Sequence, residues 1–110
     1  MAHNINIQGQ ITPEQVATLG EQGFKTIINN RPDGEESNQP LSADIAAAAE
    51  QAGIAYKEIS FAGTGLTQQH VEDFADFFNQ AEQPVLIFCR TGARSTGIYE
   101  AAKQMDLLDD

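Results

Sequence analysis

Cys89 is the residue of this sequence best suited to covalent chemistry, and it is the only cysteine in the chain. It follows the apolar run Val85–Phe88 and opens the segment Cys89-Arg-Thr-Gly-Ala-Arg-Ser95, after which a helix-compatible run begins. A strand, a short turn and a helix start place backbone N–H groups and the positive end of the helix dipole around one point. A thiol at that point ionises more easily than a free thiol. We therefore predict that Cys89 is a nucleophile.

The residues that follow Cys89 are predicted to bind an anion. Arg90 and Arg94 supply positive charge, and Arg31 stands in another candidate loop. Gly92 is expected to adopt a positive φ or to let the backbone approach the anion closely. The backbone N–H groups of Thr91 and Ala93, on either side of Gly92, would line the site. The hydroxyl of Ser95 or Thr96 would hydrogen-bond the sulfur.

Composition narrows the function classes. The formal net charge is −10, which disfavours nucleic acid and anionic membranes as partners. A single cysteine excludes an internal disulfide and fits a reducing compartment, so we expect a cytoplasmic protein. Because Cys and His do not occur with zinc spacing, we expect no metal or cofactor. The 110 residues fit one domain spanning 1–110, with neither a signal peptide nor a membrane span expected; the oligomeric state is left open.

Hydrophobic patterning predicts alternating strands and helices. Thr12-Pro-Glu-Gln15 is typical of a helix start, and Val85–Phe88 reads as a strand buried on both faces. The other predicted elements are a strand near Ile5, strands at 24–29 and 54–61, a helix at 43–52 capped by Ser42, a helix after Thr67 and a helix from about Ser95. Such alternation predicts an α/β fold with a mainly parallel sheet flanked by helices. Ligands then bind beyond the C-terminal strand ends, where the loops 30–40, 62–66 and 89–95 lie.

Two segments carry a resemblance to known families. The order of elements, with Val-Leu-Ile-Phe-Cys89 before a loop and Thr96-Gly97, resembles compact dual-specificity protein phosphatases. Gly23-Phe-Lys-Thr-Ile-Ile-Asn-Asn-Arg-Pro-Asp-Gly-Glu35, together with Cys89–Ser95, resembles the bacterial phosphatase-like domain of beta-lactamase-hydrolase-like proteins. That resemblance implies a phosphatase-like fold, and members of the group are described both as sulfur transferases and as phosphatase-like. The Cys89 loop is also similar to the loop of rhodaneses.

Loop spacing and the missing acid separate the possible chemistries. The resemblance to cysteine phosphatases implies Cys-x5-Arg, but Arg94 stands one position earlier. It also implies an Asp in the loop matching 62–66, which here has no acid, although Asp33 or Glu35 on the neighbouring loop could substitute. Sulfur transfer needs no proton donor, since sulfite and thiolates leave as anions.

These arguments favour a rhodanese-like sulfurtransferase that carries sulfur as a Cys89 persulfide between a small anionic or thiol donor, such as thiosulfate or a persulfide, and a thiol acceptor. The first alternative is a phosphatase that hydrolyses phosphate esters through a Cys89 phosphoenzyme, with Asp33 as acid. The second is a non-enzymatic anion-binding or redox-sensing domain in which Cys89 is only oxidised.

Overall fold

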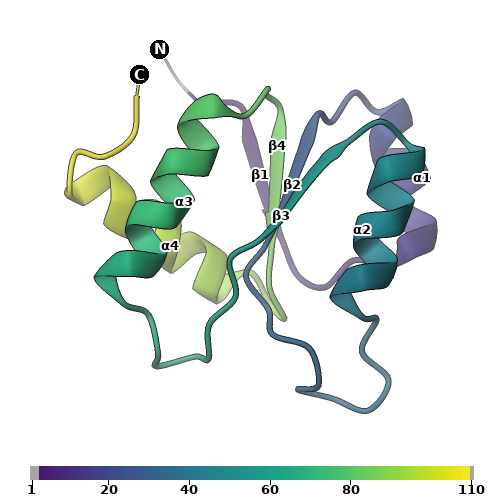
Figure 1. Cartoon of the computed structure of the whole chain (residues 1–110), viewed down its shortest axis with the longest axis horizontal. Helices are drawn as coiled ribbons and strands as arrows, with labels where there is room; N and C mark the ends of the chain where they lie inside the picture. Colours follow the sequence, from purple (N-terminus) through teal and green to yellow (C-terminus); the bar gives the residue numbers. More distant parts are fainter. Residues whose placement is uncertain (1–2, 110) are drawn as a thin grey trace.

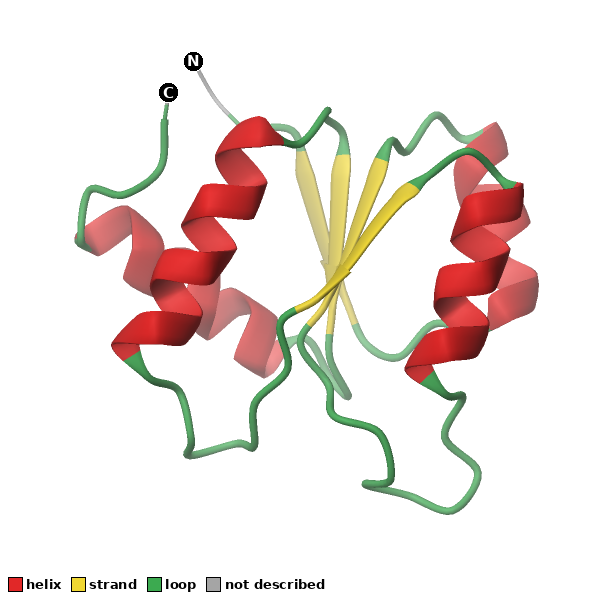
Figure 2. Cartoon of the chain, viewed as in Figure 1, coloured by secondary structure: helices red, strands yellow, loops and turns green. Residues whose placement is uncertain are grey.

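The computed structural model describes residues 3–109 and contains one four-stranded sheet between two layers of helices (Figures 1 and 2). All strands are parallel, in the order β1-β4-β2-β3. The strands are β1 (Ile5–Gln8), β2 (Thr26–Asn29), β3 (Ala55–Glu58) and β4 (Val85–Phe88); the helices are α1 (Pro13–Glu21), α2 (Ser42–Gln51), α3 (Gln68–Gln80) and α4 (Ala93–Gln104). This is the predicted α/β class and the predicted order of elements.

Strand β4 is buried on both faces because alternate side chains enter two different cores. Val85 and Ile87 pack under α3 and α4, whereas Leu86 and Phe88 pack under α1 and α2. All four side chains have no exposed surface, and burial of each contributes about 1.5–3 kcal/mol. The strand end that precedes Cys89 is therefore held firmly from both sides.

Helix starts follow the predicted capping rules at two of three positions. Thr12 and Thr67 each accept an N–H of their own helix, and the third helical residue of each bonds back, which completes a capping box. Ser42, predicted as a cap, is instead the first residue of α2, and Leu41 precedes it without a side-chain cap. The N–H of Ser42 is bonded by Asp33 from the preceding loop at 2.8 Å, so the cap comes from outside the local sequence.

Two strands are shorter than predicted. The segment 24–29 pairs only from Thr26, and 54–61 pairs only over Ala55–Glu58. Ile59 and Phe61 are nevertheless buried, and their N–H groups bond the carbonyls of Asn29 and Asn30. The apolar pattern therefore indicated correctly that Ile59 and Phe61 are buried, but it predicted strands longer than those observed.

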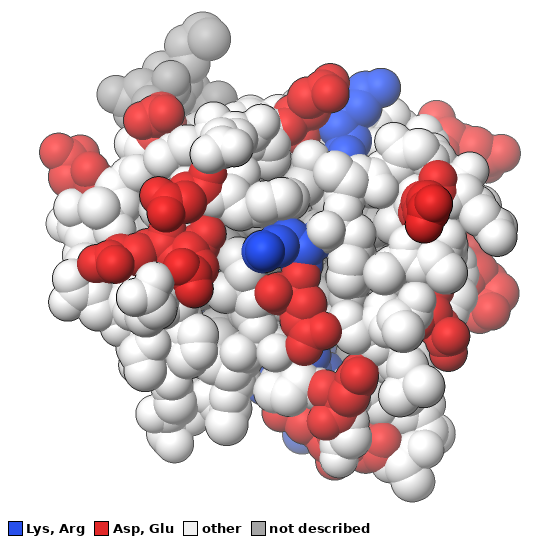
Figure 3. Space-filling view, in the orientation of Figure 1, with Lys and Arg blue, Asp and Glu red and all other residues white. Residues whose placement is uncertain are grey.

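The C-terminal ends of all four strands lie at one edge of the sheet, at the bottom of the view in Figure 1. The loops after β2, β3 and β4 extend from this edge. In Figure 3 acidic side chains are spread over the visible face, and near the bottom of the view basic and acidic groups lie together. No helix among residues 3–109 has the length and apolar character needed to cross a membrane.

Candidate active site at the Cys89 loop

Cys89 lies at the junction of β4 and α4 and has no exposed surface. Its N–H points to the carbonyl of Gln8 at 3.4 Å, and Asn30 donates to the carbonyl of Phe88 at 2.8 Å. The neighbouring strands β1 and β2 thus hold the chain on both sides of the cysteine.

Backbone N–H groups surround the sulfur. The N–H of Gly92 donates to Cys89 Sγ at 3.0 Å. Burial raises the pKa of the thiol, but hydrogen bonds from the backbone of Ser95, Thr91, Gly92 and Arg94 outweigh it, so the net pKa lies below its ordinary value. The backbone at the start of α4 therefore favours the thiolate.

Two glycines allow the loop to close around the sulfur. Gly92 has a φ of 96°, in the left-handed region, and precedes the first residue of α4. A Cβ there would meet Ile7 Cγ2 only at an ordinary contact distance of 3.4 Å, so the left-handed φ is what requires glycine at this position. Gly9 follows β1, where a Cβ would stand 2.9 Å from the carbonyl oxygen of Arg90, which the N–H of Gln10 bonds at 3.2 Å.

Arg94 is oriented by contacts to two other loops. Its Nη1 donates to Glu35 Oε2 at 2.8 Å and to the carbonyl of Phe61 at 3.0 Å, and its Nη2 donates to Glu35 Oε1 at 2.8 Å. The bond to Glu35 and, to a smaller extent, attraction to Cys89 raise the pKa of Arg94. A guanidinium has five N–H donors, and three of those of Arg94 bond oxygen atoms, so Nε–H and one Nη2–H have no oxygen partner among the described residues. These two donors lie on the same edge of the planar guanidinium group. That edge can bind two oxygens of an oxyanion with two parallel hydrogen bonds.

Three arginines and two glutamates surround the mouth of the loop, and we call them the arginine–glutamate cluster: Arg31, Glu35, Glu36, Arg90 and Arg94. The buried Arg31 donates to Glu35 at 2.9 Å, to Glu36 at 2.7 Å and to Gln10 at 3.0 Å. Four cluster members and Gly63 line an open cavity of about 470 Å³.

Glu35 is the carboxylate most strongly bound within the cluster. The hydrogen bond from Arg94, with help from Arg31 and against the effect of burial, lowers the pKa of Glu35 to about 2. The bond from Arg31 likewise lowers the pKa of Glu36. Both side chains are therefore carboxylates at neutral pH, and the formal charge of the cluster is +1.

Several predicted site residues have other roles in the structure. Asp33, proposed as a substitute acid, binds the first N–H of α2. The hydroxyl of Ser95 donates to Asn30 at 2.9 Å and that of Thr96 to the carbonyl of Gly92 at 3.0 Å, so neither donates to the sulfur as expected. Thr91 Oγ1 accepts the N–H of Ala93 at 3.4 Å.

Sequence reasoning missed how Glu35, Glu36 and Asn30 take part in this site. Glu35 was considered only as an acid, whereas it fixes Arg94 across 59 positions of sequence. The only local signal was the spacing of Arg31 and Glu35, which form an i,i+4 ion pair. Nothing in the sequence pointed to Asn30, whose side chain connects Ser95 to the carbonyl of Ile59.

Comparison with known proteins decides the family. A family model described as "Beta-lactamase hydrolase-like protein, phosphatase-like domain" matches residues 1–105. The chain belongs to this family. The resemblance seen in the sequence is therefore confirmed.

Curated relatives of this phosphatase-like domain are longer bacterial proteins. A beta-lactamase hydrolase-like protein of Xylella fastidiosa is 35% identical over 100 residues, covering 91% of this chain and 23% of that protein. The corresponding protein of Agrobacterium fabrum is 36% identical over 102 residues, covering 93% of this chain and 24% of that protein. The chain thus spans about a quarter of the length of these relatives.

Solved structures share the fold of the phosphatase-like domain. A Neisseria meningitidis protein described as a candidate phosphatase matches with a TM-score of 0.86 and 34% identity, over 96% of this chain and 75% of that one. The core catalytic domain of a Saccharomyces cerevisiae PP-IP phosphatase matches with a TM-score of 0.62 and 18% identity, over 92% and 70%; at that identity the likeness shows the fold alone.

These findings correct the predicted activity. The sulfurtransferase prediction is wrong, because the matching family and the solved relative of 34% identity are both described in phosphatase terms. The prediction gave too much weight to Arg94 standing one position early. In the folded domain Glu35 and Phe61 set the direction of that guanidinium, so loop spacing alone does not decide where it points.

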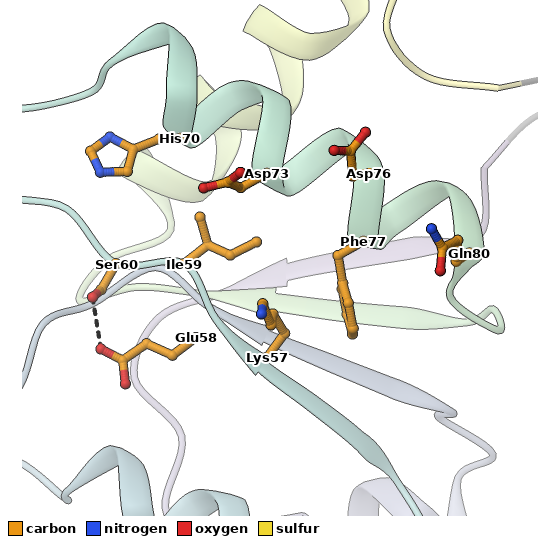
Figure 4. A pocket seen from close by; sticks show the side chains of 9 residues that line it. All are labelled: Lys57, Glu58, Ile59, Ser60, His70, Asp73, Asp76, Phe77 and Gln80. Atoms are coloured by element: carbon orange, nitrogen blue, oxygen red, sulfur yellow. Dashed lines mark hydrogen bonds between the residues drawn. The ribbon is translucent and has the colours of Figure 1, made fainter.

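A second cavity of the phosphatase-like domain lies away from the Cys89 loop. It measures about 710 Å³ and lies between β3 and α3 (Figure 4). Its walls carry Lys57, Asp73 and Phe77, and no residue of 89–95 reaches it. His70 borders it, stacks on Phe61 and bonds the N–H of Thr67 at 3.0 Å. Within residues 3–109 no three His, Cys, Asp or Glu side chains are grouped to hold a metal ion.

Proposed function

We propose that this domain is a cysteine-dependent phosphatase that hydrolyses phosphate esters through a phosphocysteine at Cys89. The observation that carries the proposal is the arrangement of donors around the sulfur. Backbone N–H groups favour the thiolate, and Arg94 presents two N–H donors without an oxygen partner among the described residues. A phosphoryl group has three oxygens that such donors can bind.

The reaction has two displacements at phosphorus. In the first, the Cys89 thiolate forms a sulfur–phosphorus bond while the phosphorus–oxygen bond to the leaving group breaks, and that oxygen keeps the electron pair. In the second, water forms a new phosphorus–oxygen bond and the sulfur–phosphorus bond breaks. The products are the thiolate and inorganic phosphate, so the enzyme is regenerated without a cofactor.

The loop residues have distinct roles in this scheme. Arg94 holds two phosphoryl oxygens and stabilises the charge that develops on them. The N–H groups of Thr91, Gly92 and Ala93 line the remaining side of the anion. Arg90, whose side chain is 60% exposed and only 3.4 Å from Glu36, is placed to contact the rest of the substrate.

Relatives support the proposal at the level of reaction type. The family description names a phosphatase-like domain, and the Neisseria relative is described as a candidate phosphatase. The chain spans about a quarter of the length of the curated relatives. The proposal therefore concerns this domain alone and not the activity of those whole proteins. We further infer a single catalytic domain that acts in the cytoplasm, where Cys89 stays reduced.

Turnover of para-nitrophenyl phosphate tests the proposal. The wild-type domain should release phosphate, Cys89→Ser should not, and Arg94→Lys should lose most activity because it keeps the charge but removes the fork. Lys103→Gln, on the exposed surface of α4, is the matched control and should keep wild-type rates. Phosphate binding without turnover would contradict a phosphatase and support an anion-binding domain.

A further inference from the structure

The Cys89 site has a nucleophile and an anion cradle, but a phosphate ester also has a leaving group. An alkoxide leaves slowly unless an acid protonates it, and a positioned general acid contributes about 10²–10⁴-fold. The ionisable groups around the loop therefore determine which leaving groups the site can release.

The carboxylates nearest the Cys89 loop are held without protons. Both oxygens of Glu35 accept N–H groups of Arg94, and one also accepts from Arg31. Glu36 Oε1 accepts from Arg31 at 2.7 Å and lies 3.4 Å from Arg90. A carboxylate that accepts from guanidinium groups in this way has no proton to give.

The other two candidate donors, Asp33 and His70, each bond a backbone N–H at the start of a helix. Asp33 Oδ1 accepts the N–H of Ser42 at the start of α2. His70 belongs to the capping box of α3 and borders the separate cavity of Figure 4. The loop after β3, residues 62–66, contains no ionisable side chain.

We propose that the site acts on phosphoryl groups carried by weakly basic leaving groups, such as acyl phosphates, other phosphoanhydrides and phosphates of acidic phenols, and not on alkyl phosphates such as phosphoserine. The inference rests on the proposed phosphatase function and specifies its substrate class. During the first displacement the leaving oxygen departs as an anion, and no proton is transferred to it. During the second, water supplies both the oxygen and the protons of the released phosphate.

The dependence of rate on leaving-group basicity tests this inference. The wild-type domain is assayed with a series of substituted phenyl phosphates, with acetyl phosphate and with an alkyl phosphate. We expect kcat/KM to fall about tenfold for each unit increase in the pKa of the leaving phenol, with efficient use of acetyl phosphate and negligible use of the alkyl phosphate. A change of less than about twofold per unit would overturn the inference, because a general acid would then be at work.

Two conservative variants test whether Asp33 or His70 acts as a general acid. Asp33→Asn keeps an oxygen for the N–H of Ser42, and His70→Gln keeps a residue type that completes a capping box. We expect the same slope in both as in the wild type, and a steeper slope in either would identify that residue as the acid and overturn the inference. Cys89-dependent turnover with a flat slope refutes the substrate class alone. Absence of Cys89-dependent turnover throughout, acetyl phosphate included, refutes both the inference and the proposed function.

Discussion

Replacing Glu35 by glutamine tests whether the arginine–glutamate cluster holds the site together. Arg94 and Arg31 lower the pKa of Glu35 from an ordinary 4.5 to about 2, and at 1.36 kcal/mol for each pKa unit this corresponds to about 3 kcal/mol. The side chain is 27% exposed, and solvent screening reduces the stabilisation to about 1–2 kcal/mol. Glu35→Gln should lower the free energy of unfolding at pH 7 by that amount.

The contribution of Glu35 to the free energy of unfolding should depend on pH in a defined direction. Between pH 4.5 and about 2 the unfolded chain binds a proton at Glu35 that the folded chain does not, so wild-type stability falls as pH falls through this window. Glu35→Gln lacks this contribution, and its difference from wild type should therefore be full at pH 7 and small near pH 2.

Urea unfolding followed by circular dichroism at pH 7, 4 and 3 measures both effects. Glu50→Gln is the matched control, because Glu50 is exposed on α2 and makes no ion pair among the described residues. Equal stability of Glu35→Gln and wild type at pH 7, or a difference that stays constant down to pH 3, would refute the argument. Because Arg94 also loses its orientation, kcat/KM for an aryl phosphate should fall roughly 10- to 100-fold.

Three further predictions concern the loop and its support. Gly92→Ala should leave the domain folded but remove turnover, because the left-handed φ of 96° strains a residue with a side chain. The control Gly97→Ala, where a Cβ meets nothing within 4 Å, should keep activity. An active Gly92→Ala variant would contradict the role of this loop in binding the anion. The rate of Cys89 alkylation by iodoacetamide should reach its plateau at lower pH than that of a cysteine peptide, whose pKa is about 8.5, since backbone hydrogen bonds lower the thiol pKa; identical profiles would count against activation. Asp33→Ala should cost about 1 kcal/mol of stability by removing the α2 cap and leave aryl phosphate turnover within twofold, whereas loss of turnover would restore Asp33 as an acid.

The fold could be predicted from local patterns because each pattern has a local cause. The uninterrupted apolar run at Val85–Phe88 requires burial on both faces, and it proved to be a central strand with those bounds. Thr12 and Thr67 lie next to the N–H groups that they cap. Ser42 failed as a cap because Asp33, nine positions earlier, bonds the same helix end.

The residues of the Cys89 loop could be predicted from the sequence. The contacts between this loop and the other loops could not. Cys89 and Gly92 are defined by the strand–turn–helix junction, which can be recognised in sequence. The partner of Arg94 is not, because Glu35 comes from a loop 59 positions away and is brought close only by the pairing of β2 with β4. Without that contact the position of Arg94 in the loop was misleading, and the activity prediction followed it.

The central claim is a covalent phosphoryl intermediate on Cys89, and intact mass after rapid acid quench tests it most directly. Mixed with an acidic aryl phosphate and quenched within the first turnovers, the wild-type domain should gain about 80 Da, the mass of one phosphoryl group. Peptide mapping should place the adduct on Cys89, and Cys89→Ser should show neither the adduct nor turnover. Turnover without any phosphoryl adduct, or turnover that survives in Cys89→Ser, would contradict the account.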